Sequence, residues 1–320
     1  MARNTMREAG EPRRTGRALL PLIGAQLSTA GGFAPVPDRA VAIGAEVAQI
    51  FSSNPRMWRP HTPSPEEVAA LVSGLRHNGI PLYLHAIYLL NLASPDDELR
   101  RRSRDSLSTA LAVGALTRAA GVVTHLGSHR GDGFRAALRR IGETVQAAID
   151  QAHLALPTAD RRPSLPPLLL ENSAGSGHTV GGDLKELSAL LQALPASCGL
   201  CLDTAHLFAA GYPVRTEVGL ESLVERLRDD GLLERVSLSH LNDSKTPFAS
   251  KRDQHENPGA GYIGLRGLGP VVRHPAFAAV PFVLEVPGKD GHGPDAANVA
   301  RVKLMRGEAA APRRRPARSG

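Results

Sequence analysis

Short apolar segments alternate eight times with longer amphipathic segments along this chain, and this alternation constrains the fold more than any other feature. The apolar segments have the length and the Val, Leu and Ile content of buried β-strands. They lie at residues 19–25, 46–52, 80–85, 121–125, 167–171, 198–203, 235–240 and 281–285.

The intervening segments carry the start and stop signals of helices. Residues 64–79 and 94–121 open with Ser-Pro and close with glycine, and residues 182–194 place an acidic residue in the first turn. Alternating strands and helices predict a parallel sheet, and eight strands close most simply into a (β/α)₈ TIM barrel. An open doubly wound sheet is the alternative, although no G-x-G-x-x-G follows the first strand.

The length of 320 residues suits one barrel domain. Hydrophobic residues make up 42% of the chain but aromatic residues only 4%, so the core must consist mostly of Leu, Val, Ile and Ala. We predict one domain over residues 18–306, with disordered basic tails at 1–17 and 307–320 whose Arg, Ala, Pro and Gly content cannot form a core. The Pro-rich segment 156–167 is predicted to be an enlarged surface loop.

The net charge of +7 is unevenly distributed. Residues 1–17 carry +3 and residues 301–320 carry +6, so residues 18–300 carry −2. The overall charge is therefore weak support for specific DNA binding by the folded body, although basic ends add nonspecific attraction to phosphates.

The sequence contains no apolar run of about 20 residues that could cross a membrane, and we expect no signal peptide because no apolar segment follows the basic N-terminal residues. Its two cysteines, Cys198 and Cys201, cannot form a disulfide framework, and we expect a cytoplasmic protein. The C-x-x-C spacing resembles half of a zinc ribbon, but no second pair exists and side-chain alternation in a buried strand explains both cysteines better.

Six successive apolar segments, from the third to the eighth, end in a residue type that binds metals. The carboxyl ends of barrel strands meet at one rim, where active sites lie, so side chains about 200 residues apart can converge. With three more such residues in the following loops, the candidate metal ligands are His85, His125, Glu171, Asp203, His206, His240, Asp253, His255 and Glu285.

Each of these residues alone has a simpler interpretation. A single histidine at a strand end is usually only hydrogen-bonded, and an aspartate before a helix, such as Asp203, is usually an N-cap. Their common placement favours a metal centre instead. Nitrogen and oxygen donors without thiolates suit zinc or manganese. Nine donors are too many for one ion and fit three ions that share bridging carboxylates.

Several long motifs are similar to those of the endonuclease IV family of abasic-site endonucleases, and the resemblance extends from about residue 22 to residue 304. The motifs are SNPRMW (53–58), HAIYLLNLAS (85–94), HLGSHRGDG (125–133), ENSAGSG (171–177), CLDTAHLFAAGY (201–212), HLNDSKTPFASKRDQH (240–255) and VLEV (283–286).

The resemblance implies a TIM barrel with three zinc ions. It assigns His85, His125 and Glu171 to one ion. Glu171 also bridges to a second ion, held by Asp203, His240 and Glu285, and the third ion is held by His206, Asp253 and His255. It further implies that Arg56 and Tyr88 contact DNA at the lesion. Gln26 stands where relatives usually carry histidine, and Val286 where threonine is common.

The implied activity is zinc-dependent hydrolysis of the phosphodiester 5′ to an abasic site in double-stranded DNA, leaving a 3′-hydroxyl. In this scheme Glu171 fixes the metal pair and handles a proton. We expect a monomer without an obligate protein partner. Two alternatives stay open: a sugar isomerase or epimerase, which needs about four ligands around one ion, and a non-enzymatic DNA-binding module acting through its Arg-rich ends.

Overall fold

The computed structural model describes residues 20–156 and 164–307 of the chain. The predicted N-terminal tail, nearly all of the predicted C-terminal tail and most of the 156–167 loop lie outside the described residues.

Eight parallel strands close into a barrel, as predicted from the alternation, and the open-sheet alternative is wrong. Around the barrel the order is β1-β10-β7-β6-β5-β4-β3-β2. Each predicted segment contains one strand, although β1 extends one residue further than predicted. The strands are β1 (Ile23–Gln26), β2 (Ala48–Phe51), β3 (Leu82–His85), β4 (Gly121–Thr124), β5 (Leu168–Glu171), β6 (Gly199–Asp203), β7 (Val236–His240) and β10 (Phe282–Leu284).

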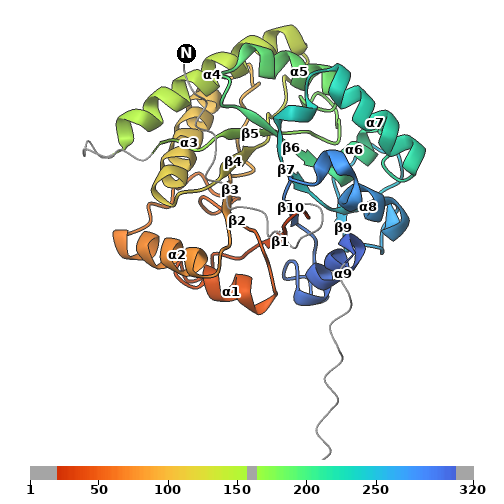
Figure 1. Cartoon of the computed structure of the whole chain (residues 1–320). Coiled ribbons are helices and arrows are strands. Elements are labelled where there is room, and N and C mark those ends of the chain that lie inside the picture. The colour runs from red at the N-terminus through yellow and green to blue at the C-terminus, as the bar shows by residue number, and fades with distance from the viewer. Residues whose placement is uncertain (1–19, 157–163, 308–320) are drawn as a thin grey trace, which may run out of the picture.

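Helices surround the strands as an outer ring (Figure 1). They are α1 (Val36–Ala42), α2 (Pro65–His77), α3 (Asp97–Leu116), α4 (Phe134–Ala155), α5 (Leu184–Ala193), α6 (Thr204–Ala210), α7 (Glu217–Asp229), α8 (Gly264–Arg273) and α9 (Ala296–Arg306), with short 3₁₀ turns η1 (Leu233–Arg235) and η2 (Pro275–Phe277). No helix in the described parts of the chain is long and apolar enough to cross a membrane.

Local sequence signals explain where these helices begin. At α2 the Ser64 hydroxyl accepts a hydrogen bond from Glu67 N, and Ser64 N donates to the Glu67 carboxylate, which together form a capping box. At α3 the Asp96 carboxylate accepts from the backbone N–H groups of Glu98 and Leu99. Such caps fix where α2 and α3 begin after the strands that precede them.

A ring of apolar side chains fills the barrel interior beneath the carboxyl-terminal rim. β3, β4, β5, β6, β7 and β10 contribute one member each, and the residue before β2 contributes another. Since alternate residues of a strand point to the same face, the residue two positions further along each strand also points into the barrel, closer to the carboxyl-terminal rim. The ring consists of Val47 (just before β2), Tyr83, Val123, Leu169, Cys201, Leu238 and Val283.

The last helix corrects the charge assignment made from the sequence. Arg301, Lys303 and Arg306 belong to α9, and the Arg306 side chain is buried against Glu46. Part of the positive charge counted at the C-terminal end therefore belongs to the barrel, and residues 18–306 together carry +1.

Candidate metal centre

All nine candidate ligands lie around the carboxyl-terminal rim of the barrel. His85 Nε2 lies 3.1 Å from Glu171 Oε2, and the rings of His85 and His125 have centroids 5.3 Å apart. Within the described residues, three groups bring potential ligand atoms within 4.8 Å of one another. These groups are His85, His125 and Glu171; Glu171, Asp203, His240 and Glu285; and Asp203, His206 and His255.

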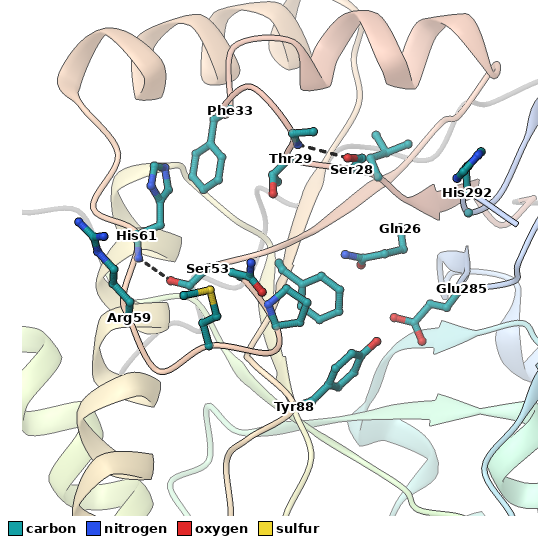
Figure 2. Close-up of a pocket in the computed structure, with 18 of the residues that line it drawn as sticks. Gln26, Ser28, Thr29, Phe33, Ser53, Arg59, His61, Tyr88, Glu285 and His292 are labelled. Carbon is teal, nitrogen blue, oxygen red and sulfur yellow. Dashed lines mark hydrogen bonds between the residues drawn. The ribbon is translucent and has the colours of Figure 1, made fainter.

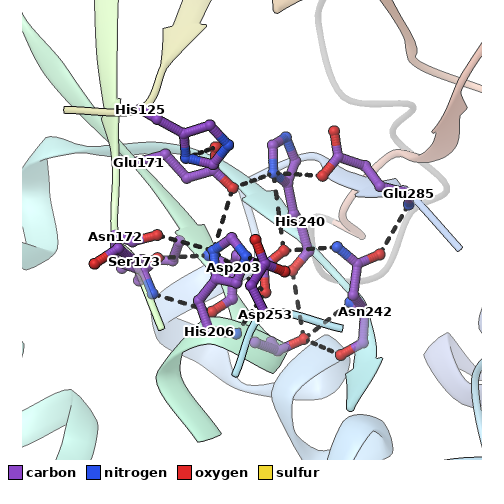
Figure 3. A network of polar contacts seen from close by, with 12 residues as sticks. His125, Glu171, Asn172, Ser173, Asp203, His206, His240, Asn242, Asp253 and Glu285 are labelled. Carbon is purple, nitrogen blue, oxygen red and sulfur yellow. Dashed lines mark hydrogen bonds and ion pairs between the residues drawn. The ribbon is translucent and has the colours of Figure 1, made fainter. Parts of the chain in front are cut away.

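Glu171 connects the first two groups through different oxygen atoms. Its Oε2 lies 3.1 Å from His85 Nε2 and 3.3 Å from His125 Nδ1, whereas its Oε1 lies 3.0 Å from His240 Nδ1. Figure 3 shows its carboxylate between His125 and His240. A buried carboxylate that presents one oxygen to each group has the geometry of a bridging ligand.

The third group differs from the set that the resemblance implies. Asp203 joins it, since Asp203 Oδ2 lies 3.5 Å from His255 Nε2. Asp253 lies against the same group, with its Oδ1 3.0 Å from His206 Nε2 and 3.4 Å from His255 Nε2. Asp203 therefore faces two groups, and the sequence did not indicate this second bridging position.

Backbone carbonyl groups orient three of the histidine rings. The Nδ1 atoms of His85, His206 and His255 lie 2.6, 2.9 and 3.2 Å from backbone carbonyl oxygens. A carbonyl oxygen can only accept, so each Nδ1 carries a proton, and each Nε2 faces the other candidate ligand atoms. Ring orientation by an outer hydrogen bond of this kind is typical of metal-binding histidines.

The four carboxylates of the centre give it negative charge, which favours bound cations. Within the described residues the four carboxylates of the centre form ion pairs only with histidines and none with Lys or Arg. Burial opposes ionisation of Glu171, but nearby His125 and His240 outweigh it and hold the pKa of Glu171 well below its usual range. Burial likewise opposes protonation of His206, yet Asp203 and Asp253 hold its pKa well above the usual value. Divalent cations would supply the charge that these groups lack.

Three amide side chains that the sequence interpretation missed support the ligands. Asn242 Nδ2 donates to Asp203 Oδ2 at 2.6 Å, and Asn242 Oδ1 accepts from Glu285 N. Asn172 exchanges two hydrogen bonds with the backbone of Asp203. Gln49 lies between His240 and Glu285. For the two asparagines a signal existed, because both lie one or two residues after a ligand.

A buried aspartate, Asp243, ties together the two ends of the segment that carries Asp253 and His255. The loop begins at the short hairpin formed by β8 (Asp243–Ser244) and β9 (His255–Glu256). The Asp243 carboxylate is fully buried and accepts hydrogen bonds from five backbone N–H groups. Those donors are Ser244, Gly259, Gly261, Ile263 and Gly264. At Gly261 an added Cβ would lie 2.6 Å from Asp243 Oδ1, so this close approach requires glycine.

A cavity of about 1030 Å³ opens beside the centre, between the loops after β1, β2 and β10. Gln26, Tyr88 and Glu285 line the same part of it (Figure 2). Neither side-chain amide atom of Gln26 has a hydrogen-bond partner among the described residues, although both atoms are buried. Tyr88 is 53% exposed, and its N–H donates to the carbonyl oxygen of Pro55, next to the exposed Arg56. Arg56 itself does not line the cavity.

The two cysteines belong to different apolar clusters, and both are free and buried. Burial raises the pKa of Cys198 to about 11 and that of Cys201 to about 12, so both remain thiols at neutral pH. Among the described residues neither cysteine belongs to a group of potential metal ligands, which supports side-chain alternation in a buried strand, rather than half of a zinc ribbon, as the explanation of C-x-x-C.

The fold and rim define a known class of barrel. Residues 37–306 match the family described as xylose isomerase-like TIM barrels. A solved D-tagatose 3-epimerase-like protein shares the fold, with a TM-score of 0.64 and 15% identity over 89% of this chain and 95% of that chain.

Within that class two relatives are much more similar. A protein named probable endonuclease 4 from Nitratidesulfovibrio vulgaris strain Hildenborough is 37% identical over 294 residues, covering 89% of this chain and 99% of that protein. The crystal structure of endonuclease IV from Thermus thermophilus has a TM-score of 0.76 and 36% identity, covering 89% of this chain and 98% of that chain. The chain belongs to the endonuclease IV family.

Proposed function

We propose that this protein is a DNA-repair endonuclease that hydrolyses the phosphodiester 5′ to abasic sites in double-stranded DNA and leaves a 3′-hydroxyl. We further propose that it holds three zinc ions. The observation that carries the proposal is the convergence of three adjoining groups of nitrogen and oxygen donors, joined by Glu171 and Asp203, on the rim of an endonuclease IV-family barrel.

Zinc fits the donors better than other common ions. The set contains imidazole nitrogens and carboxylate oxygens, and three or four donors per group match the usual coordination number of zinc. When bound, zinc ions supply Lewis acidity, which lowers the pKa of a water molecule and neutralises charge on a phosphate.

The residues of the chain have distinct parts in this proposal. Glu171 is buried with both oxygens facing histidines, which supports a bridging role that fixes the spacing of two sites. Its proposed handling of a proton stays a prediction. Asp203 is held by Asn242 and Asn172, so its carboxylate is oriented before any ligand binds.

The cavity beside the centre supports selectivity for abasic sites. Its volume can accommodate an extruded sugar-phosphate, with the Gln26 amide available to donate or accept hydrogen bonds. A nucleotide without a base costs little stacking energy to extrude. We propose that Tyr88 and Arg56, on adjoining exposed loops, contact the DNA around that nucleotide.

The isomerase alternative has less support. The D-tagatose 3-epimerase-like protein shares the fold at only 15% identity. In addition, one metal site with four ligands would leave five of the nine candidate ligands without a role.

The direct test is incubation with a duplex that carries one abasic analogue, beside the same duplex intact. We expect one cut on the 5′ side of the lesion, a 3′-hydroxyl at the new end, loss of cutting after chelation and recovery with zinc. Elemental analysis should give about three zinc ions per chain. A single ion, together with interconversion of a keto-sugar and no strand cutting, would replace the proposal with the isomerase alternative.

A further inference from the structure

Gln49 occupies a position in the barrel equivalent to those of the candidate ligands. Two residues after each member of the apolar ring lies a polar side chain at the rim, and six of these seven are candidate ligands. The seven are Gln49, His85, His125, Glu171, Asp203, His240 and Glu285. Gln49 is the member of the set that cannot ionise, and it is fully buried.

The Gln49 amide makes two hydrogen bonds, and the direction of one fixes the direction of the other. Gln49 Nε2 lies 2.7 Å from Glu285 Oε1, and Gln49 Oε1 lies 3.0 Å from His240 Nε2. An ionised carboxylate can only accept, so the amide must turn its NH₂ group towards Glu285. Its oxygen must then face His240, and this oxygen can only accept. His240 Nε2 therefore carries a proton.

This orientation leaves the other nitrogen of His240 free for a cation. His240 Nδ1 lies 3.0 Å from Glu171 Oε1 and 3.1 Å from Glu285 Oε2. At His85, His206 and His255 a backbone carbonyl oxygen fixes the ring. Within the described residues no backbone oxygen accepts a hydrogen bond from the His240 ring, and the Gln49 amide oxygen is the acceptor instead.

We propose that Gln49 is a positioning residue of the central metal group, which selects the ring nitrogen that His240 offers to the ion and holds Glu285 in place. This inference rests on the proposed function, because it assumes an ion held by Glu171, Asp203, His240 and Glu285. An outer hydrogen-bonding partner of this type typically contributes about 10- to 100-fold to metal affinity.

The test compares zinc retention by the full chain and by Gln49→Met, a change that keeps the side-chain length but removes both hydrogen bonds. Each protein is dialysed against buffers of fixed free zinc, and bound zinc is counted. The Met variant should need about 10- to 100-fold more free zinc to keep its last ion, with a plateau of two ions where the parent holds three. Gln26→Met is the matched control, because Gln26 pairs with Gln49 in the strand register but makes no hydrogen bond with a candidate ligand among the described residues.

A second readout separates positioning from a general packing role. In the zinc-loaded parent, the ring N–H proton of His240 should give a protected NMR signal, assigned by its loss in His240→Gln. Gln49→Met should remove that protection. Gln49→Glu can still accept from His240 but can no longer donate to Glu285, so it should keep the signal and still bind zinc more weakly. If Gln49→Met does not fold, Gln49→Glu carries the test by itself.

The outcomes distinguish this inference from the proposed function. A parent protein that binds fewer than three zinc ions would overturn the proposed metal count, independently of the result for the Gln49 variants. A parent with three ions and a folded Gln49→Met variant with the same zinc affinity and the same protected His240 signal overturns the role of Gln49. Equal zinc affinity in Gln49→Glu and the parent would also overturn it.

Discussion

The Nε2 atoms of His206 and His255 lie 3.4 Å apart, while the Nδ1 atom of each ring is hydrogen-bonded to a backbone carbonyl oxygen. In neutral rings with this orientation both Nε2 atoms are acceptors, so two lone pairs face each other. A proton or a metal ion between them relieves the repulsion. The folded protein therefore contains a site that is complete only when a cation occupies it.

Zinc should consequently stabilise the fold. A ligand that binds only the native state adds about 4 kcal/mol per site when its free concentration is about a thousand times Kd. We expect the chelated protein to melt at a lower temperature than the zinc-loaded protein, measured by thermal unfolding. His255→Gln should reduce the zinc-dependent gain, whereas His153→Gln, on the exposed face of α4, should not. Identical melting with and without zinc would contradict the prediction.

Asp243→Asn should loosen the loop that carries Asp253 and His255. The change removes an acceptor oxygen and turns an NH₂ group towards backbone donors, which should cost about 2–4 kcal/mol of the free energy of unfolding. We expect weaker binding of one zinc ion as well, measured by zinc retention beside urea unfolding. Asp229→Asn at the exposed end of α7 is the control. Full zinc affinity in a destabilised variant would show that the loop does not depend on Asp243.

Glu46 should contribute a pH-dependent part of the stability. Burial opposes its ionisation, but hydrogen bonds from Arg306 and from Ile23 N outweigh burial and lower its pKa below 4.5. The lowered pKa means that this stability is present above about pH 4.5 and is lost as the pH falls through the pKa of the folded state. Glu46→Gln should cost about 2–4 kcal/mol at pH 7.

The check on Glu46 is urea unfolding of the parent and Glu46→Gln at several pH values. The difference in unfolding free energy between the two proteins should be constant from pH 8 to about pH 5 and shrink at lower pH. A difference that grows as the pH falls would contradict this explanation.

Tyr88→Ala and Arg56→Ala should weaken DNA binding without changing zinc content. Loss of one aromatic stacking surface typically costs about 1–3 kcal/mol, and loss of one phosphate-contacting cation reduces the salt dependence of binding by about one unit. Binding titrations with an abasic duplex at several salt concentrations measure both effects. Arg139→Ala, on the exposed face of α4, is the control for Arg56. Unchanged affinity in the Tyr88→Ala, Arg56→Ala double variant would refute the predicted contacts.

A chain truncated to residues 18–306 should cut at nearly the same rate at saturating substrate. The truncation removes a net charge of +6, from 1–17 and 307–320, but keeps Arg306 and every candidate ligand. We therefore expect weaker binding at low salt and a shallower dependence on salt. Kinetics at saturating and limiting substrate separate the effect on turnover from the effect on DNA binding. A large fall in turnover at saturating substrate, with zinc content unchanged, would show that a terminal segment contributes to the metal centre.

The sequence alone determined the barrel and the identity of the candidate ligands. Strand and helix alternation is a local property, so eight short apolar runs sufficed to predict eight strands. His85, His125 and Glu171 were identifiable because each lies at the end of a strand or directly after it. The charge of α9 was misassigned, because composition does not reveal that Arg306 pairs with Glu46, 260 residues away.

Only the tertiary structure decided which donors share a group. Asp203 faces both His255 and the central group, and Gln49 reaches His240 across 191 residues of sequence. Side-chain alternation along β2 explains why Gln49 points into the barrel, but neutral amides have many uses, and the partners of Gln49 depend on barrel closure. Local patterns determine which face a side chain occupies; the register and curvature of the closed sheet determine which other side chains it meets there.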